Sequence, residues 1–437
     1  MRGFAIVPAM KRAFILAAAV LGLSAAAFGQ AKPALAATNA PSSPWQGRWG
    51  GAIDLGQQKI AFEFEVGPLG ALLDIPANEL FGYPSAAIRL EPESLAVDWQ
   101  FGGGILALRL ELGPDGRATG LFAQGDAQGP ASAARAALAG RPGVELALAG
   151  KDGSLLPGTL VPAQGDRAKP PLVILHAGLG SADRDGNNYN VPGRHDALMQ
   201  LAGALSELGV ASYRYDKRGS GMASWLVRGE AELSFQAWID DLVAIAEALA
   251  KDGRYAGVWL LGLNDGATVA AAAANRLPAA RGLVVACASA DSVYESFMKA
   301  IEDAPDEFKA EGLAAVESLR DGRPVGELSE FYAGALRASF RPYLREAFGY
   351  DLKAELARYR GKTLIAQGNM DMQATLNDFT RLGEAARDPV TIVVPYMNHV
   401  LKDVPAAVDE NYAAFSDPAY PVSEIFAAAV AEFVAEP

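Results

Sequence analysis

The chain has 437 residues and a formal net charge of -13, from 38 basic and 51 acidic side chains. This length suits two domains and provides ample chain for a large core. An acidic chain without a sustained basic run argues against nucleic acid or an anionic membrane surface as a partner. Neutral or cationic small molecules remain open as ligands.

Residues 1–37 have the features of a secretory signal peptide. Basic residues precede an apolar run over 13–29, and Ala-Leu-Ala at 34–36 fits a cleavage site. The alternative is an uncleaved anchor, but the run is short for a membrane span and rich in alanine. We therefore expect a periplasmic or secreted protein with no membrane span after signal cleavage.

Cys287 is the single cysteine of the chain. It lies inside the apolar run 282–288, so the simplest interpretation is a small buried core residue. A single cysteine cannot form an internal disulfide, and the fold must therefore depend on packing.

The first part of the mature chain has the alternation of β-strands. Apolar residues recur at every second position over 59–66, 95–99 and 106–112. We predict a small antiparallel β domain over 45–123. The segment 124–143, rich in Ala, Gly and Gln, is expected to be a linker.

From residue 144 onward, apolar strands alternate with helical stretches, which predicts a largely parallel sheet with helices on both faces over 144–437. A long helical insertion at 291–358 is expected to form a cap over the carboxyl ends of the strands. Its aromatic residues are equally consistent with packed core. The expected strands are 171–176, 211–215, 256–261, 282–287, 363–367 and 390–394, and the expected helices are 196–208, 234–251 and 267–275.

Gly262-Leu263-Asn264-Asp265-Gly266 has the spacing of a nucleophile elbow, G-x-S-x-G, with asparagine at the serine position. A predicted strand precedes it and a predicted helix follows, and Gly262 and Gly266 supply the small residues that such a sharp turn needs. The alternative is an ordinary glycine-containing connection between a strand and a helix.

Two downstream loops offer an acid and a base. Asp371 follows the strand at 363–367, and His399 follows the strand at 390–394. A carboxylate can orient an imidazole that acts as a general base. The chain order of elbow, acid and histidine is that of α/β-hydrolases.

The glycine-rich loop at 176–181 is the candidate oxyanion site. We expect the N–H of Leu179 to pair there with the N–H of Asp265 and to bind a developing oxyanion. A dinucleotide site is the alternative, but the G-x-G-x-x-G pattern is not met. We expect no metal ion and no cofactor.

Together, several motifs resemble the secreted bacterial α/β-hydrolases of the serine carboxylesterase group, which are related to serine peptidases of the prolyl-oligopeptidase type. The resemblance implies an α/β-hydrolase fold with a helical cap, preceded in some members by a small β domain. It implies that Asp371 is the acid and His399 the base. The motifs lie at 176–187, 213–221, 234–241, 367–371 and 398–402.

The departure from this group falls on the nucleophile. The group has Gly-His-Ser-Glu-Gly or a close variant, whereas this chain has Asn264 at the serine position. A carboxamide has no proton whose removal gives a useful nucleophile, and loss of the nucleophile costs on the order of a million-fold in rate. Asp265 is a possible replacement, but moving the tip by one residue places bulky Leu263 where a small residue is needed.

Three functions follow. The favoured one is a weak or inactive pseudo-hydrolase that binds a small ester-like or peptide-like ligand. The second is an active carboxylic ester hydrolase that uses Asp265 or water. The third is a carbohydrate-binding β domain that uses Trp45, Trp49 and Trp99, although core packing explains these residues equally well.

Overall fold

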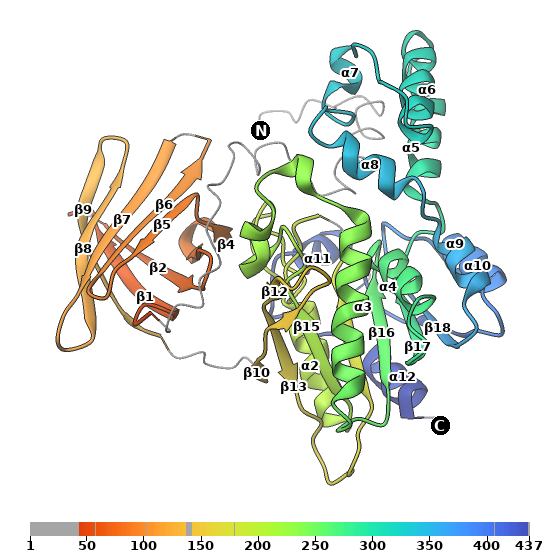
Figure 1. Cartoon of the computed structure of the whole chain (residues 1–437), viewed down its shortest axis with the longest axis horizontal. Helices are drawn as coiled ribbons and strands as arrows, with labels where there is room; N and C mark the ends of the chain where they lie inside the picture. The colour runs from red at the N-terminus through yellow and green to blue at the C-terminus, as the bar shows by residue number, and fades with distance from the viewer. Residues whose placement is uncertain are drawn as a thin grey trace.

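The computed structural model describes residues 43–56, 58–102, 104–136, 142–178, 180–405 and 407–435. The predicted signal peptide, part of the predicted linker and Leu179 lie outside these ranges. Within them, no helix has the length and apolar character needed to cross a bilayer. The chain forms an antiparallel β domain and a larger α/β domain (Figure 1).

The β domain is one nine-stranded antiparallel sheet that curls around its own core (Figure 1). Alternate side chains point inward, as the period of two predicts. The strand order is β4-β3-β2-β1-β9-β8-β7-β6-β5. The strands are β1 (Gly47–Asp54), β2 (Lys59–Val66), β3 (Ala71–Ile75), β4 (Leu80–Pro84), β5 (Ala87–Leu90), β6 (Ser94–Phe101), β7 (Gly104–Leu112), β8 (Arg117–Gln124) and β9 (Ala127–Arg135).

The tryptophans of this domain are core residues. Trp45, Trp49 and Trp99 are each at most 1% exposed and pack among the other inward-facing side chains. A buried indole cannot stack on a sugar at the surface, so these residues do not form a carbohydrate site.

The structure places β9 within 124–143, where the sequence predicts a linker. This strand pairs with both β1 and β8 and so joins the two halves of the sheet. Its alanine and glycine residues have a weak β-propensity, so the sequence does not predict a strand here. A small residue is needed here for close packing, because a Cβ atom on Gly129 of β9 would lie 2.0 Å from the carbonyl oxygen of Asp54 at the end of β1.

The α/β domain contains an eight-stranded sheet in the order β10-β13-β15-β14-β16-β17-β18-β19. Six neighbouring strands run parallel to one another, in the order β15, β14, β16, β17, β18 and β19. The other two, β10 and β13, are antiparallel to their neighbours. A short hairpin, β11 (Leu148–Ala149) and β12 (Leu155–Leu156), lies between β10 and β13 in the chain. The sheet strands are β10 (Val144–Glu145), β13 (Gly158–Val161), β14 (Leu172–His176), β15 (Ala211–Tyr215), β16 (Val258–Leu263), β17 (Ala280–Ala286), β18 (Lys362–Gly368) and β19 (Val390–Val394).

Helices cover both faces of this sheet, which confirms the predicted fold class. One face packs on α2 (Ala197–Glu207) and α12 (Glu424–Ala435), and the other on α3 (Phe235–Lys251) and α4 (Gly266–Ala274). Ser234 is the N-cap of α3, because its side chain accepts a hydrogen bond from the N–H of Ala237 at 3.0 Å.

The helical insertion comprises α5 (Val293–Glu302), α6 (Asp306–Arg320), α7 (Glu330–Ala333), α8 (Arg341–Ala347) and α9 (Leu352–Arg358), and most of it stands at the top of Figure 1. Its largest aromatic side chains belong to the core, since Phe297, Tyr332, Phe340 and Tyr343 are at most 1% exposed.

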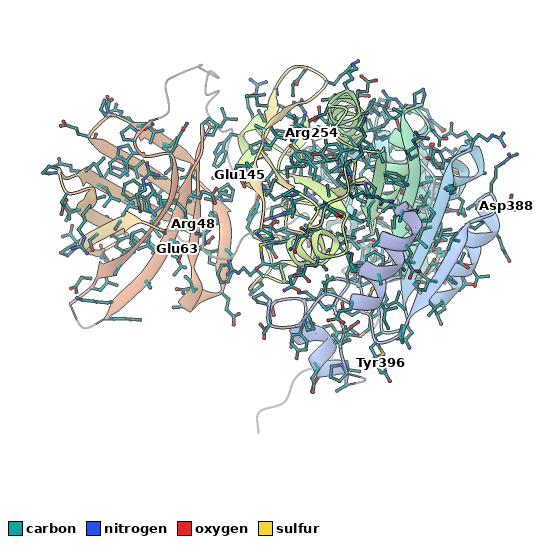
Figure 2. All side chains as sticks on the ribbon, turned by 90° about the horizontal axis from the view of Figure 1, so that it is seen from below. Arg48, Glu63, Glu145, Arg254, Asp388 and Tyr396 are labelled. Atoms are coloured by element: carbon teal, nitrogen blue, oxygen red, sulfur yellow. The ribbon has the colours of Figure 1, made fainter. Side chains whose placement is uncertain are left out.

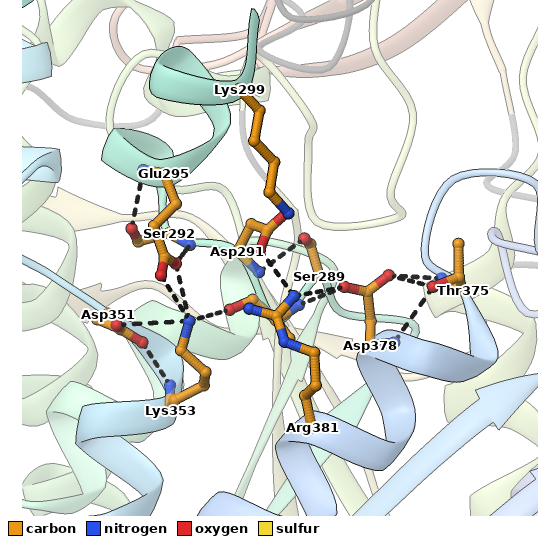
Figure 3. A network of polar contacts seen from close by, with 11 residues as sticks. Ser289, Asp291, Ser292, Glu295, Lys299, Asp351, Lys353, Thr375, Asp378 and Arg381 are labelled. Carbon is orange, nitrogen blue, oxygen red and sulfur yellow. Dashed lines mark hydrogen bonds and ion pairs between the residues drawn. The ribbon is translucent and has the colours of Figure 1, made fainter. Parts of the chain in front are cut away.

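Ion pairs fix this insertion to the sheet domain (Figure 3). Asp291 pairs with Arg381 at 2.7 Å, and this arginine belongs to α10 (Leu376–Ala385). Within the insertion, Lys353 of α9 binds Glu295 of α5 at 2.8 Å. The insertion is therefore tied to the helix that follows β18.

Candidate active site

Asn264 lies at the tip of a sharp turn between β16 and α4. Its φ of 54° is in the left-handed region, which a non-glycine residue adopts only at a cost. A Cβ on Gly262 would lie 2.4 Å from the Cα of Ala267, and one on Gly266 would lie 2.6 Å from the carbonyl oxygen of Ala177. The two glycines therefore allow the turn, and the turn projects the side chain of residue 264 from the sheet.

His399 and Asp371 are hydrogen-bonded to one another. The imidazole Nδ1 lies 2.9 Å from one carboxylate oxygen of Asp371 and 3.1 Å from the other. The Asp371 side chain is fully enclosed and that of His399 is 6% exposed. This contact fixes the imidazole so that Nε2 is the nitrogen available for chemistry.

Three donors besides His399 hold the Asp371 carboxylate. They are the side-chain amide of Gln367 at 2.9 Å and the backbone N–H groups of Gln373 at 2.7 Å and Ala374 at 3.0 Å. Burial acts to raise the pKa of Asp371, but the His399 charge and these hydrogen bonds outweigh it and lower the pKa below its usual value. The carboxylate is therefore ionised at neutral pH.

The loop that carries His399 is shaped by its neighbour Asn398, which is fully buried. The Asn398 side-chain oxygen accepts hydrogen bonds from the N–H groups of Val400 at 3.1 Å and Lys402 at 3.0 Å. Its side-chain amide donates to Asn411 at 3.2 Å. The Asn-His-Val-Leu-Lys sequence is thus a closed turn that positions the histidine.

Asp265 is the first residue past the tip and caps α4 with a helical backbone, φ -65° and ψ -20°. The residue is half-buried, but its Oδ2 atom is enclosed and has no hydrogen-bond partner among the described residues. Burial raises the pKa of Asp265 to about 6, and the nearby His399 charge opposes this shift. Its N–H belongs to the first turn of a helix, where backbone donors lack partners within the helix.

The glycine-rich loop after β14 packs against the elbow. A Cβ on Gly178 would lie 3.5 Å from the Cβ of Asn264 and 3.4 Å from the carbonyl oxygen of Leu263. The predicted second oxyanion donor, Leu179, lies outside the described residues. The loop thus reaches the tip of the elbow.

Buried ion pairs hold the chain that continues from this loop. Arg184 binds Asp216 at 2.8 Å, and Arg214 binds Asp185 at 2.7 Å. All four side chains are at most 9% exposed. The Lys217 ammonium donates to the carbonyl oxygen of Ala182 at 2.7 Å. The Asp-Arg-Asp and Asp-Lys-Arg sequences therefore clamp the two strand ends to one another.

A cavity of about 180 Å³ opens beside these groups and brings Asn264 and His399 into one space. None of its lining residues belongs to the helical insertion, so the cap is not its wall. The wall comes instead from a segment between β14 and α2. The lining residues are Gly178, Ala182, Gly186, Asn187, Asn188, Val191, Gly193, Arg194, His195, Leu263, Asn264, Gln373, His399, Val400 and Phe415.

His195 is one of several lining residues that the sequence analysis did not identify, and the one with a titratable side chain close to neutral pH in its ordinary state. Burial lowers its pKa to about 4, and the charge of Lys402 acts in the same direction. The imidazole is therefore neutral at pH 7, and its Nδ1 accepts the N–H of Ala197 at 3.2 Å. The only sequence signal was the position of His195 just before α2, and this position does not indicate that the side chain faces the cavity.

A second cavity, of about 210 Å³, lies between the two domains. Its charged side chains bind one another: Arg48 pairs with Asp74 at 2.6 Å, and Arg184 pairs with Glu145 at 2.6 Å. Figure 2 shows Arg48 and Glu145 at this junction. It lacks Asn264 and His399, so the candidate active site is the smaller cavity.

Comparison with protein families matches residues 193–395 to the serine aminopeptidase, S33, family. Comparison with curated proteins gives no match. Among solved structures, the chain is similar to Est1E from Butyrivibrio proteoclasticus, with 16% identity, a TM-score of 0.42, and coverage of 67% of this chain and 98% of that one. It is also similar to a proline iminopeptidase from Mycobacterium smegmatis, with 17% identity, a TM-score of 0.43, and the same coverage.

The match to the family covers less than half of the chain, and it falls on the α/β domain. Together with the strand order, the two antiparallel strands at one edge and the helices on both faces, it establishes that this chain carries an α/β-hydrolase fold.

Proposed function

We propose that this protein is a pseudo-hydrolase of carboxylesterase lineage that binds a small ester-like or peptide-like ligand with little or no turnover. The observation that carries the proposal is Asn264 at the tip of the elbow, in the cavity that contains His399. A carboxamide nitrogen is a poor nucleophile because its lone pair is delocalised into the carbonyl group. The step that forms an acyl-enzyme is therefore missing.

The remaining groups favour binding. The cavity offers the imidazole of His399 and the amides of Asn264 and Gln373 beside the apolar side chains of Leu263 and Val400. A few polar groups in a largely preformed pocket are typical of small-molecule sites. An ester or amide carbonyl can accept hydrogen bonds here without being attacked.

A second function has one observation in its favour. Asp265 is close enough to His399 for their charges to interact, and burial raises its pKa to about 6. A carboxyl group with such a pKa suits general acid–base catalysis near neutral pH. As a covalent nucleophile it is disfavoured, since Asn264 has the left-handed backbone of the tip and Asp265 is already helical. Water activation is the form of catalysis that this site allows.

The test is hydrolysis of short-chain p-nitrophenyl esters by the purified protein and its Asn264→Ser variant. We expect the parent to stay at background and the variant to gain at least about a hundredfold, because serine supplies the nucleophile that the acid–histidine pair can activate. His399→Ala in the variant should abolish the gain. Asn264→Ala is the matched control, and it should remain as inactive as the parent.

Two results would contradict the proposal. Rapid turnover by the parent that is lost in His399→Ala would establish an enzyme with a non-standard nucleophile or water mechanism, and Asp265→Asn would then identify the group. An inactive, well-folded Asn264→Ser protein would show that the rest of the site cannot support acyl transfer, so that the hydrolase lineage would not describe its chemistry.

We also propose that the protein is exported and that residues 1–37 are removed. Sequencing the N-terminus of the protein recovered from the periplasm or the medium tests this proposal. Full-length chain found only in the cytoplasm would overturn it.

A further inference from the structure

One wall of the candidate site is a segment without helix or strand, residues 186–195, which we call the strap. The strap supplies seven of the fifteen described residues that line the cavity: Gly186, Asn187, Asn188, Val191, Gly193, Arg194 and His195. The strap is therefore the largest contributor to the wall of this cavity.

The β domain contacts the strap directly. The N–H of Gly193 donates to the carbonyl oxygen of Glu79 at 2.7 Å. The Arg194 guanidinium lies over the ring of Phe81, 5.1 Å from its centroid. The ring of Tyr189 meets the ring of Tyr83 edge-on, with the centroids 5.5 Å apart. The β-domain residues lie in or just before β4, so one strand holds the outer side of the strap.

This strand is itself fixed to the α/β domain. The indole N–H of Trp225 donates to the carbonyl oxygen of Ser85 at 2.9 Å. The Trp225 ring also packs tightly against Gly70, where a Cβ would lie 2.1 Å from the ring. The two domains therefore meet in a close contact beside β4, which lies on the side of the β domain that faces the α/β domain (Figure 1).

The strap also contacts the residues that follow α11 (Val408–Ala413). The N–H of Arg194 donates to the carbonyl oxygen of Ser416 at 3.2 Å, and a Cβ on Gly193 would lie 2.5 Å from the Ser416 side chain. Phe415, next in the chain, lines the cavity. The strap is thus held between two supports, of which the β domain provides one.

We propose that the β domain contributes to the ligand site. Through Glu79, Phe81 and Tyr83 it holds the strap in position. It thereby sets the width of the cavity beside Asn264 and the affinity of that cavity for its ligand. This inference depends on the proposed function only in that the cavity binds a ligand. Phe81 is a positioning residue, because it acts through Arg194 and does not line the candidate active site itself.

The first test needs no activity. Amide hydrogen exchange of the strap is measured in the whole protein and in Phe81→Ala. Loss of the cation–π contact should make strap amides exchange roughly threefold to tenfold faster, because local opening becomes easier. Phe81→Tyr keeps the ring and should restore protection. Leu121→Ala, on an exposed part of β8, is the matched control and should leave the strap unchanged.

The second test uses the Asn264→Ser protein and p-nitrophenyl esters of short and long acyl chains. Phe81→Ala should raise KM roughly threefold to tenfold and alter the preference between the two chain lengths, with a smaller change in kcat. Unchanged strap exchange in a folded Phe81→Ala protein would overturn the inference. An inactive Asn264→Ser protein would count against the proposed function alone, since the exchange experiment would still decide this one.

Discussion

The elbow around Asn264 and the pair formed by Asp371 and His399 meet in one cavity, but only the pair has the side chains that acyl transfer needs. The elbow has its glycines, its left-handed tip and its helix, and lacks a nucleophile. The pair has its short hydrogen bond and three further donors to the carboxylate.

This difference shows that the geometry of the turn and its chemistry have separate causes. Steric contacts around Gly262 and Gly266 dictate the turn whatever the residue at the tip. The chemistry depends on one side chain that makes no contribution to those contacts. The proposed lack of turnover is therefore compatible with a preserved elbow, and the following experiments examine how much of the remaining site is functional.

The largest effect is expected at Asp371, measured in the Asn264→Ser protein. Asp371→Asn should lower kcat/KM for a p-nitrophenyl ester by roughly a thousandfold to ten-thousandfold, because an amide disfavours the imidazole tautomer that activates the serine. Asp321→Asn, on the exposed surface of the insertion, is the control and should have no effect. Equal activity of the two variants would show that the pair has no catalytic role.

The next largest effect is expected for the buried ion pair between Arg184 and Asp216, which follows the glycine-rich loop. Asp216→Ala leaves the Arg184 guanidinium without its closest buried partner and should lower the free energy of unfolding by about 3–5 kcal/mol. Urea unfolding measures this change. Arg228→Ala is the comparison. Its pair with Glu232 is exposed, with side chains 62% and 38% accessible, so its loss should lower the free energy of unfolding far less than Asp216→Ala does. Similar losses in both variants would contradict a buried structural role for Asp216.

The sequence predicted the α/β-hydrolase fold because its signals are local. Apolar strands such as β15 and β19 have the bounds expected from their residues alone. The wall of the cavity was not predictable in this way. The strap has no periodic pattern, and its position depends on contacts with Glu79 and Ser416, which are far away in the sequence. The helical insertion was expected as a cap whose aromatic residues were equally consistent with packed core; the largest of these residues are in the core, and the insertion does not line the cavity.

The smallest expected effect is the pH dependence of stability that Asp265 contributes. It concerns the elbow directly, because Asp265 follows the residue at its tip. Burial raises its folded pKa from 3.8 to about 6. Between these two values the folded state holds the proton more tightly than the unfolded state, so stability falls as the pH rises through this window. Above about pH 6 the full cost of the buried charge is present, and below 3.8 it is absent.

Asp265→Asn removes this charge and should remove the associated slope. Relative to the parent, the variant should gain about 1–2 kcal/mol in free energy of unfolding between pH 4 and pH 7, after allowance for the partial exposure of the residue. Urea titrations at several pH values measure the difference. A constant difference would mean that solvent stabilises the Asp265 carboxylate, and the group would then have too low a pKa to act as a base for water. A difference that grows with pH would show that the Asp265 carboxyl titrates with a raised pKa. Asp265 would then be the residue to examine for any turnover that the parent protein shows.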